Sequence, residues 1–245
     1  MTPEFAGRTD TGLVRSVNQD GYYMDPQGKF FIVADGMGGH ASGDEASRLA
    51  LEAFQSYFRE NWDTPADTPT LIRQGFNAAN QAILQVQQDN PEKADMGTTA
   101  VLVMVREEQW WWANLGDSRL YRWRQGQLQQ LTRDHTLVAR ALATGSLSWE
   151  QAREHPLRHV LYKCLGREDL GENLEKVDVE SFEVAVGDRL LLCSDGLTEE
   201  ITDAELAECF QGEASCEKRA ADAIELAKKR GGSDNITVIF ISVPE

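Results

Sequence analysis

The stretch FFIVADGMGGH at residues 30–40 is the most informative segment of this chain for its fold. An apolar run ends at Asp35-Gly36, which is typical of a buried strand followed by a turn. Residues Gly36 to Ala41 also fit the G-x-G-x-x-A pattern of a dinucleotide-binding turn. That interpretation needs a second strand that ends in an acid ~20 residues further on, and none follows. A dinucleotide site is therefore the disfavoured alternative.

Helices are expected directly after this strand. Apolar residues recur at helical spacing from Ala46 to Phe58 and again from Ile72 to Val86, while Trp62–Pro69 between them is typical of a loop. Each helix would present one apolar stripe to a layer beneath it. A third helix is expected near Glu217–Lys229.

Further strands are short and apolar. They are expected at residues 98–105, 109–114, 120–124, 188–193 and 236–243. The second and third of these are predicted to pair as a hairpin through the Gly-Asp-Ser turn at 116–118. Residues 134–170 show no clear strand and are expected to form a small helical insertion. Strands at ~10-residue spacing with an inserted helix pair favour an α+β fold with antiparallel sheets covered by helices.

Composition and charge narrow the class of protein. The 245 residues are 41% hydrophobic and 26% charged, as in soluble globular proteins, and no apolar run approaches the ~18 residues of a membrane span. The N-terminus lacks the pattern of a secretory signal. The net charge of −16 argues against nucleic-acid and anionic-membrane partners. Four irregularly spaced cysteines indicate free thiols, so we expect a cytoplasmic protein.

Five aspartates occupy similar positions beside strands and turns. Asp35 and Asp195 each follow an apolar strand and precede glycine, Asp117 lies in the Gly-Asp-Ser turn, Asp234 comes just before the last strand, and Asp20 follows Asn-Gln. Any one of them could be a simple turn residue. Together, carboxylates that project from neighbouring strand ends would repel unless a cation neutralises them. An all-oxygen set suits a hard divalent ion such as Mg²⁺ or Mn²⁺.

A family resemblance emerges from seven motifs taken in order. They are VRSVNQD at 14–20, VADGMGGH at 33–40, MGTTAV at 96–101, NLGDSRLYR at 114–122, LTRDH at 131–135, LLLCSDGLTE at 190–199 and GGSDNITVI at 231–239. The set resembles the bacterial branch of the metal-dependent PPM/PP2C-type Ser/Thr protein phosphatases over essentially the whole chain. It is especially similar to compact stand-alone cyanobacterial members, some of which act on the phosphorylated signalling protein PII.

The resemblance implies a fold and a reaction. The fold would be a four-layer α-β-β-α sandwich with two central antiparallel sheets, in a single domain over 1–245 with a flexible helical flap at about 136–170. The reaction would be hydrolysis of phosphoserine and phosphothreonine in proteins by a water that bridges two metal ions. Two tightly bound Mn²⁺ or Mg²⁺ ions and a third, weaker ion are implied. A phosphorylated PII-type protein is one candidate substrate, although the chain itself does not show which phosphoprotein is hydrolysed, and we expect the chain to be monomeric.

The resemblance also implies metal ligands. Asp35 would bridge the two ions, and the carbonyl of Gly36 would bind one of them. Asp195 and Asp234 would bind the other ion. Asp117 corresponds to the position that, with Asp195, builds the third site.

Roles in substrate chemistry are implied for four more residues. Asp20 would hold a metal-bound water, and Arg15 would bind the phosphate. His40 would protonate the leaving oxygen, and His159, in the flap, would contact substrate. His135 of LTRDH is expected to be a structural hydrogen bonder.

Two other classes of function remain open. One is a non-catalytic scaffold, which would be expected to lose the carboxylates that are present here. The other is a different two-metal hydrolase, such as a phosphodiesterase or a nuclease, against which the acidic composition argues.

Overall fold

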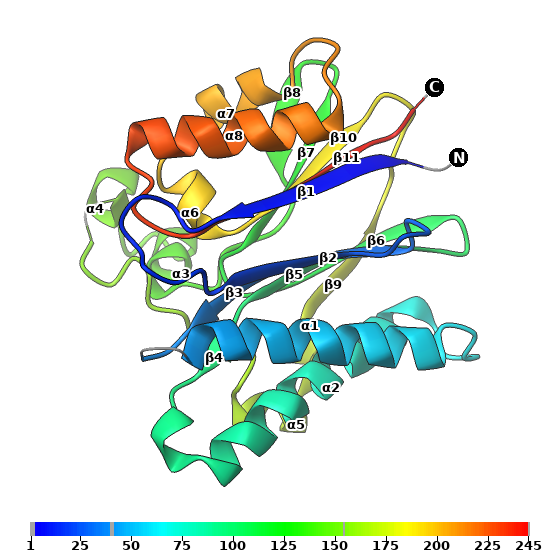
Figure 1. Ribbon diagram of the computed structural model, residues 1–245, viewed down its shortest axis with the longest axis vertical. Helices are drawn as coiled ribbons and strands as arrows, with labels where there is room; N and C mark the ends of the chain where they lie inside the picture. Colours follow the sequence, from blue (N-terminus) through cyan, green and yellow to red (C-terminus); the bar gives the residue numbers. More distant parts are fainter. Residues whose placement is uncertain (1–2, 40–41, 154, 245) are drawn as a thin grey trace.

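The computed structural model describes residues 3–39, 42–153 and 155–244, which fold into four layers (Figure 1). Two antiparallel sheets pack face to face, and helices cover both outer faces. This arrangement confirms the predicted α+β sandwich. Among the helices of the described residues, none combines the length and apolarity that crossing a bilayer requires.

The first sheet has the strand order β1-β11-β10-β7-β8. Its strands are β1 (Glu4–Asp10), β7 (Arg119–Arg124), β8 (Gln127–Gln130), β10 (Arg189–Cys193) and β11 (Ile236–Ser242). Helices α7 (Asp203–Cys209) and α8 (Cys216–Arg230) cover its outer face. Ser215 caps α8 by accepting the N–H of Lys218, and Gly231 ends it.

The second sheet has the order β2-β3-β5-β6-β9, and β4 pairs with the end of β3. Its strands are β2 (Asp20–Met24), β3 (Phe30–Met37), β4 (Gly97–Thr98), β5 (Ala100–Arg106), β6 (Gln109–Leu115) and β9 (Asp178–Phe182). Helices α1 (Ser42–Asn61) and α2 (Thr68–Asp89) cover its outer face, as their apolar stripes predicted. The short 3₁₀ helices are η1 (Pro91–Lys93) and η2 (Leu174–Lys176).

Three apolar layers hold the sandwich together. The central one lies between the sheets and contains Phe31, Val33, Leu190 and Ile239, all fully buried. The other two lie between each sheet and its helices. Burial of apolar surface on this scale is the main stabilising contribution to such a fold.

The predicted hairpin between residues 109–114 and 120–124 is wrong. Strand β6 pairs with β5 and β9, whereas β7 pairs with β8 and β10 in the other sheet. The Gly-Asp-Ser segment therefore carries the chain from one sheet to the other. The real hairpin partner of β6 is β5, through a turn in which Glu107 and Glu108 both have positive φ.

The flap is helical, as expected for residues 134–170. It contains α3 (Leu137–Ala143), α4 (Trp149–Arg153) and, at its end, α5 (Glu168–Glu172), which contacts α2. A bridge between Thr136 and Leu161 closes its base. In Figure 1, α3 and α4 of the flap lie at the same end of the sandwich as α6 (Asp195–Thr198), away from both termini.

Candidate active site

Four aspartates from the two sheets lie together at the flap end of the sandwich. Asp20 begins β2 and stands opposite Asp35 of β3 in the antiparallel register. Asp195 begins α6 directly after β10, and Asp234 lies just before β11. The charge of Asp195 acts on the pKa of Asp20 and Asp35, and the charge of Asp234 acts on those of Asp20 and Asp195. The four side chains are therefore neighbours.

The four carboxylates crowd together in what we call the recess, where each of these residues is only partly exposed to water. Desolvation, together with the charges of Asp195 and Asp234, raises the pKa of Asp20 to about 7. Desolvation also raises the pKa of Asp35 well above its ordinary range, and the charges of Asp20, Asp195 and Asp117 add to this effect. Carboxylates this close together disfavour one another's ionised state. They can all be ionised at neutral pH only when a bound cation neutralises their charges. The cluster is therefore built for bound positive charge.

The backbone of Asp35 is fixed by the MGTT segment at 96–99. Thr99 donates its N–H to the Asp35 carbonyl at 2.9 Å and accepts the Asp35 N–H on its Oγ1 at 3.0 Å. Thr98 donates from its Oγ1 to the same carbonyl at 2.8 Å. Because both polar backbone groups of Asp35 are satisfied, the direction in which its side chain leaves the strand is set.

Gly36 stands where β3 passes against the start of α1. A Cβ at this position would lie 1.9 Å from the carbonyl oxygen of Gly43 and 2.6 Å from that of Gln19. The Gly36 N–H donates to the same Gln19 carbonyl at 3.1 Å. Only glycine fits here, so the close approach of strand and helix explains the Asp-Gly pair.

Asp20 is held by Ser194, which comes from the other sheet. The buried Ser194 Oγ donates to Asp20 Oδ2 at 2.6 Å and accepts the N–H of Thr237 at 3.0 Å. The second oxygen, Asp20 Oδ1, is buried and has no hydrogen-bond partner among the described residues. A buried polar atom without a partner is costly. This orphaned oxygen, in an all-carboxylate donor set, fits a hard divalent cation with its bound water.

Arg15 reaches the cluster from the loop between β1 and β2. Its Nη2 donates to Asp234 Oδ2 at 2.7 Å, and half of its side chain remains exposed. Asn235 fixes this loop, because its Nδ2 donates to the carbonyls of Thr11 and Val17, each at 3.0 Å. The guanidinium is thus held at the mouth of the recess, where it can meet an incoming anion.

Asp117 lies in the segment that crosses from β6 to β7. Only 8% of its surface is exposed, and burial, followed by the charge of Asp195, raises its pKa well above the ordinary range. His135 holds the turn, because its Nδ1 accepts the N–H of Gly116 at 3.0 Å. The Nε2 of His135 therefore carries the proton and donates to Asp178 at 3.1 Å. The expected structural role of His135 is confirmed.

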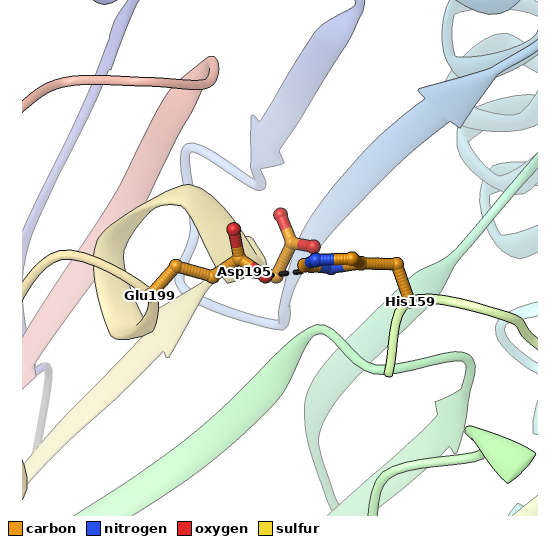
Figure 2. Close-up of side chains that lie close together, drawn as sticks. All are labelled: His159, Asp195 and Glu199. Carbon is orange, nitrogen blue, oxygen red and sulfur yellow. Dashed lines mark ion pairs between the residues drawn. The ribbon is translucent and has the colours of Figure 1, made fainter. Parts of the chain in front are cut away.

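The flap approaches the cluster through His159. Its Nδ1 lies 2.7 Å from Glu199 Oε1. Figure 2 shows that the carboxylates of Glu199 and Asp195 both lie beside this imidazole ring. Desolvation, together with the charge of Asp195, raises the pKa of Glu199 to about 7. The sequence analysis missed Glu199, although it lies one helical turn after Asp195 in the motif DGLTE.

A cavity of about 1160 Å³ opens beside the cluster, between the flap and the two-sheet core. Its walls include Asp117 and Asp195 from the core and Arg140, Arg158 and His159 from the flap. A space of this size exceeds that of typical small-molecule pockets. It has room for a phosphorylated side chain together with neighbouring residues.

The structure thus brings together, at one end of the fold, the predicted site residues that it describes. Those near the recess are Arg15, Asp20, Asp35, Gly36, Asp117, His159, Asp195 and Asp234. His40 lies outside the described residues.

Comparison with known proteins identifies the family. The sequence profile of the family described as Protein phosphatase 2C matches residues 14–229. The chain belongs to this family. It is therefore a metal-dependent protein serine/threonine phosphatase of the PPM/PP2C type.

Relatives of this phosphatase match nearly its whole length. It is 37% identical to the serine/threonine phosphatase stp of Listeria monocytogenes, over 98% of this chain and 95% of the relative. It is 34% identical to the serine/threonine protein phosphatase PstP of Mycobacterium tuberculosis, over 98% of this chain and 45% of that protein. These relatives place it among the bacterial enzymes.

Solved structures of PP2C phosphatases share the fold. The M. tuberculosis phosphatase PstP/Ppp superposes with a TM-score of 0.89 at 33% identity, with both chains covered completely. The catalytic domain of PstP in complex with two manganese ions gives a TM-score of 0.86 at 32% identity, over 99% of each chain. A two-manganese centre is thus known in a protein of this fold and similarity.

Proposed function

We propose that the phosphatase reaction takes place where the aspartates of the two sheets meet. Asp35 would be shared by two divalent ions, with the carbonyl of Gly36 as a further ligand of one ion and Asp195 and Asp234 as ligands of the other. The support is the crowding of these desolvated carboxylates around a buried oxygen of Asp20 that has no partner. Two divalent ions, when bound, would lower the pKa of a water molecule and neutralise phosphoryl oxygens.

The residues around this cluster have complementary tasks. Arg15, now on Asp234, would turn its guanidinium fork to two oxygens of the incoming phosphate. Asp20 would orient water through its second oxygen while Ser194 holds the first. His40 would give a proton to the leaving serine or threonine oxygen. Such a site needs no nucleophilic side chain.

We also propose a third, weaker ion between Asp117 and Asp195. Burial and the charge of Asp195 both act on Asp117, which supports a shared cation there. Because Mn²⁺ and Mg²⁺ keep much of their water when few protein ligands are offered, this ion should exchange readily. Asp117→Ala should lower turnover of phosphopeptides more than about twofold and reduce the need for millimolar metal. An unchanged rate and metal dependence would leave Asp117 as a turn residue.

We propose phosphoproteins as the substrate class, which the family supports. A phosphoserine or phosphothreonine protein would enter the cavity under the flap, where His159 would contact it. We propose a phosphorylated PII-type protein as substrate, on the resemblance to compact cyanobacterial members alone. Comparing the rates on phosphorylated PII and on an unrelated phosphopeptide tests this choice, and equal rates would contradict it.

We further propose that residues 1–245 act as one catalytic domain, as a monomer in the cytoplasm. The net charge of −16 supports protein rather than nucleic-acid or membrane partners, and all four cysteines are free thiols. Light scattering during gel filtration tests the monomer.

Hydrolysis of an aryl phosphate and a phosphopeptide in Mn²⁺, with and without chelator, tests the proposed centre. Asp35→Asn should lower turnover at least ~10³-fold, because activation of water is lost with the shared ligand. The same change should stabilise the metal-free protein, since it removes a desolvated carboxylate. Asp222→Asn, which removes an exposed ion pair with Lys218 on α8, is the control and should keep its activity. Wild-type turnover of Asp35→Asn in saturating Mn²⁺ would refute the assignment.

A further inference from the structure

His159, Asp195 and Glu199 form a group of side chains of metal-ligand type that the proposed catalytic centre does not use together. One donor atom from each lies within 4.8 Å of the others. Figure 2 shows the imidazole of His159 beside both carboxylates. Around a tetrahedral zinc ion with bonds of ~2.1 Å, ligand atoms lie ~3.4 Å apart. A shift of about an ångström would therefore close the three donors around one ion.

The outer two side chains are free to make that shift. His159 and Glu199 have 42% and 30% of their side chains exposed. Glu199 follows α6 and donates its N–H to the carbonyl of Asp195 at 2.8 Å, which places both carboxylates on one helical face. The residue after His159, Val160, accepts the N–H of Leu137 at 2.9 Å, so the histidine is tied to the start of α3. The group thus spans two parts of the fold, the flap and α6.

The donor chemistry of this group differs from that of the aspartate cluster. One imidazole nitrogen and two carboxylates suit Zn²⁺, with water in the fourth position. The catalytic cluster offers oxygen atoms only, which suit Mg²⁺ and Mn²⁺. The group also differs from the third site proposed above, because it uses His159 and Glu199 in place of Asp117.

We propose that His159, Asp195 and Glu199 bind a Zn²⁺ ion that fastens the flap to α6. Asp195 is also a proposed ligand of the catalytic ions, so zinc draws this carboxylate away from them. The bound ion at the same time holds the flap over the cavity beside the site. Zinc is therefore a reversible inhibitor of the phosphatase, and this consequence, unlike the binding itself, rests on the proposed function.

Calorimetric titration of the whole chain with Zn²⁺, in saturating Mg²⁺, tests the site directly. The wild type should bind one zinc ion at this group. His159→Ala and Glu199→Gln should each weaken zinc binding by about 10- to 100-fold, because even the loss of a residue that only hydrogen-bonds to a metal ligand has an effect of this size. His155→Ala is the matched control, because this second flap histidine accepts the N–H of Leu157 within its own turn. It should bind zinc like the wild type.

Two further measurements separate a flap clamp from zinc bound elsewhere. Amide hydrogen exchange over residues 155–163 should slow on addition of zinc in the wild type and in His155→Ala, but not in Glu199→Gln. Zinc should inhibit aryl phosphate hydrolysis by the wild type. When each protein's rate is expressed relative to its own rate without zinc, Glu199→Gln should need about 10-fold more zinc than the wild type for the same fractional inhibition.

The outcomes are distinct. Equal zinc affinity in the wild type and both variants overturns the site, and so does inhibition that neither substitution relieves, because zinc would then be displacing the catalytic ions. Zinc binding that leaves flap exchange unchanged overturns the clamp. Zinc binding that depends on His159 and Glu199, in a chain that hydrolyses no phosphate ester, supports the site and refutes the proposed catalytic centre instead.

Discussion

Without metal, the phosphatase should lose stability as the pH rises from about 4.5 to 7.5, because its site holds protons that the unfolded chain has lost. The pKa of Asp20 is about 7 in the folded state against 3.8 as a reference for the unfolded chain. Native Asp20 therefore keeps its proton from pH 4.5 until the pH approaches 7, where it ionises. The stabilisation is fully present below pH 3.8 and is lost as the pH rises through 7.

The size of the effect follows from the pKa difference. Each pKa unit corresponds to ~1.4 kcal/mol, so the difference of about three units at Asp20 gives about 4 kcal/mol over its whole titration and about 3 kcal/mol between pH 4.5 and 7.5. The pKa values of Asp35, Asp117 and Asp195 are raised too, so these residues act in the same direction. This slope is opposite to that of ordinary acid denaturation, in which carboxylates with lowered pKa values lose stability as the pH falls.

Urea unfolding in EDTA, followed by tryptophan fluorescence at several pH values, measures this slope. Asp20→Asn should reduce the fall in unfolding free energy between pH 4.5 and 7.5 by the amount that Asp20 contributes. It should also raise the free energy of unfolding at pH 7.5. Asp10→Asn is the control: the pKa of Asp10 is lowered despite partial desolvation, through Lys228 and the Gly12 N–H, so its contribution is complete at pH 4.5. Saturating Mn²⁺ should abolish the fall, because bound cations favour the ionised carboxylates.

A free energy of unfolding that stays constant or rises between pH 4.5 and 7.5 in EDTA would refute the reasoning. So would an Asp20→Asn variant with the slope of the wild type. Either result would mean that the carboxylates are neutralised or hydrated without metal.

Three substitutions test the framework of the site. Gly36→Ala should destabilise by at least ~1–3 kcal/mol in thermal unfolding, because its Cβ would meet the Gly43 carbonyl at 1.9 Å; a melting temperature like that of the wild type would contradict this. Ser194→Ala should cost about 1–3 kcal/mol in urea unfolding, since it leaves Asp20 and a buried backbone N–H without their partner; no loss would mean that water replaces the hydroxyl. Phe76→Ala should cost ~3–5 kcal/mol in the core beneath α2, and a loss below 1 kcal/mol would show that this layer collapses to fill the space.

The sequence carried the local signals of the site. Asp35 comes directly after the apolar run of β3, although the strand continues to Met37, and Asp195 follows the apolar strand β10, so both positions are visible from composition alone. The helices were visible for the same reason, because an apolar stripe is a property of a single segment. These features need no knowledge of what the segment packs against.

Features that depend on distant partners could not be predicted from the residues alone. Thr98 is 63 residues from Asp35, and Ser194 is 174 residues from Asp20, so nothing local marks them as supports of the site. The wrong hairpin prediction has a different cause. The true turn, at Glu107 and Glu108, has positive φ at both residues, where glutamate is uncommon. The Gly-Asp-Ser segment looked like the better turn, yet it joins two sheets.

The division of the site between two sheets limits how such an enzyme can be recombined. Asp20 and Asp35 belong to one sheet, while Asp195 and Asp234 adjoin the other. Any gene crossover between residues 36 and 194 gives a chimaera whose two pairs of aspartates come from different parents. Their spacing then depends on how the inter-sheet layer around Phe31, Val33, Leu190 and Ile239 repacks. Active chimaeras should therefore come from parents whose inter-sheet layers have the same side-chain volume. Parents that share only the catalytic motifs should often give inactive chimaeras.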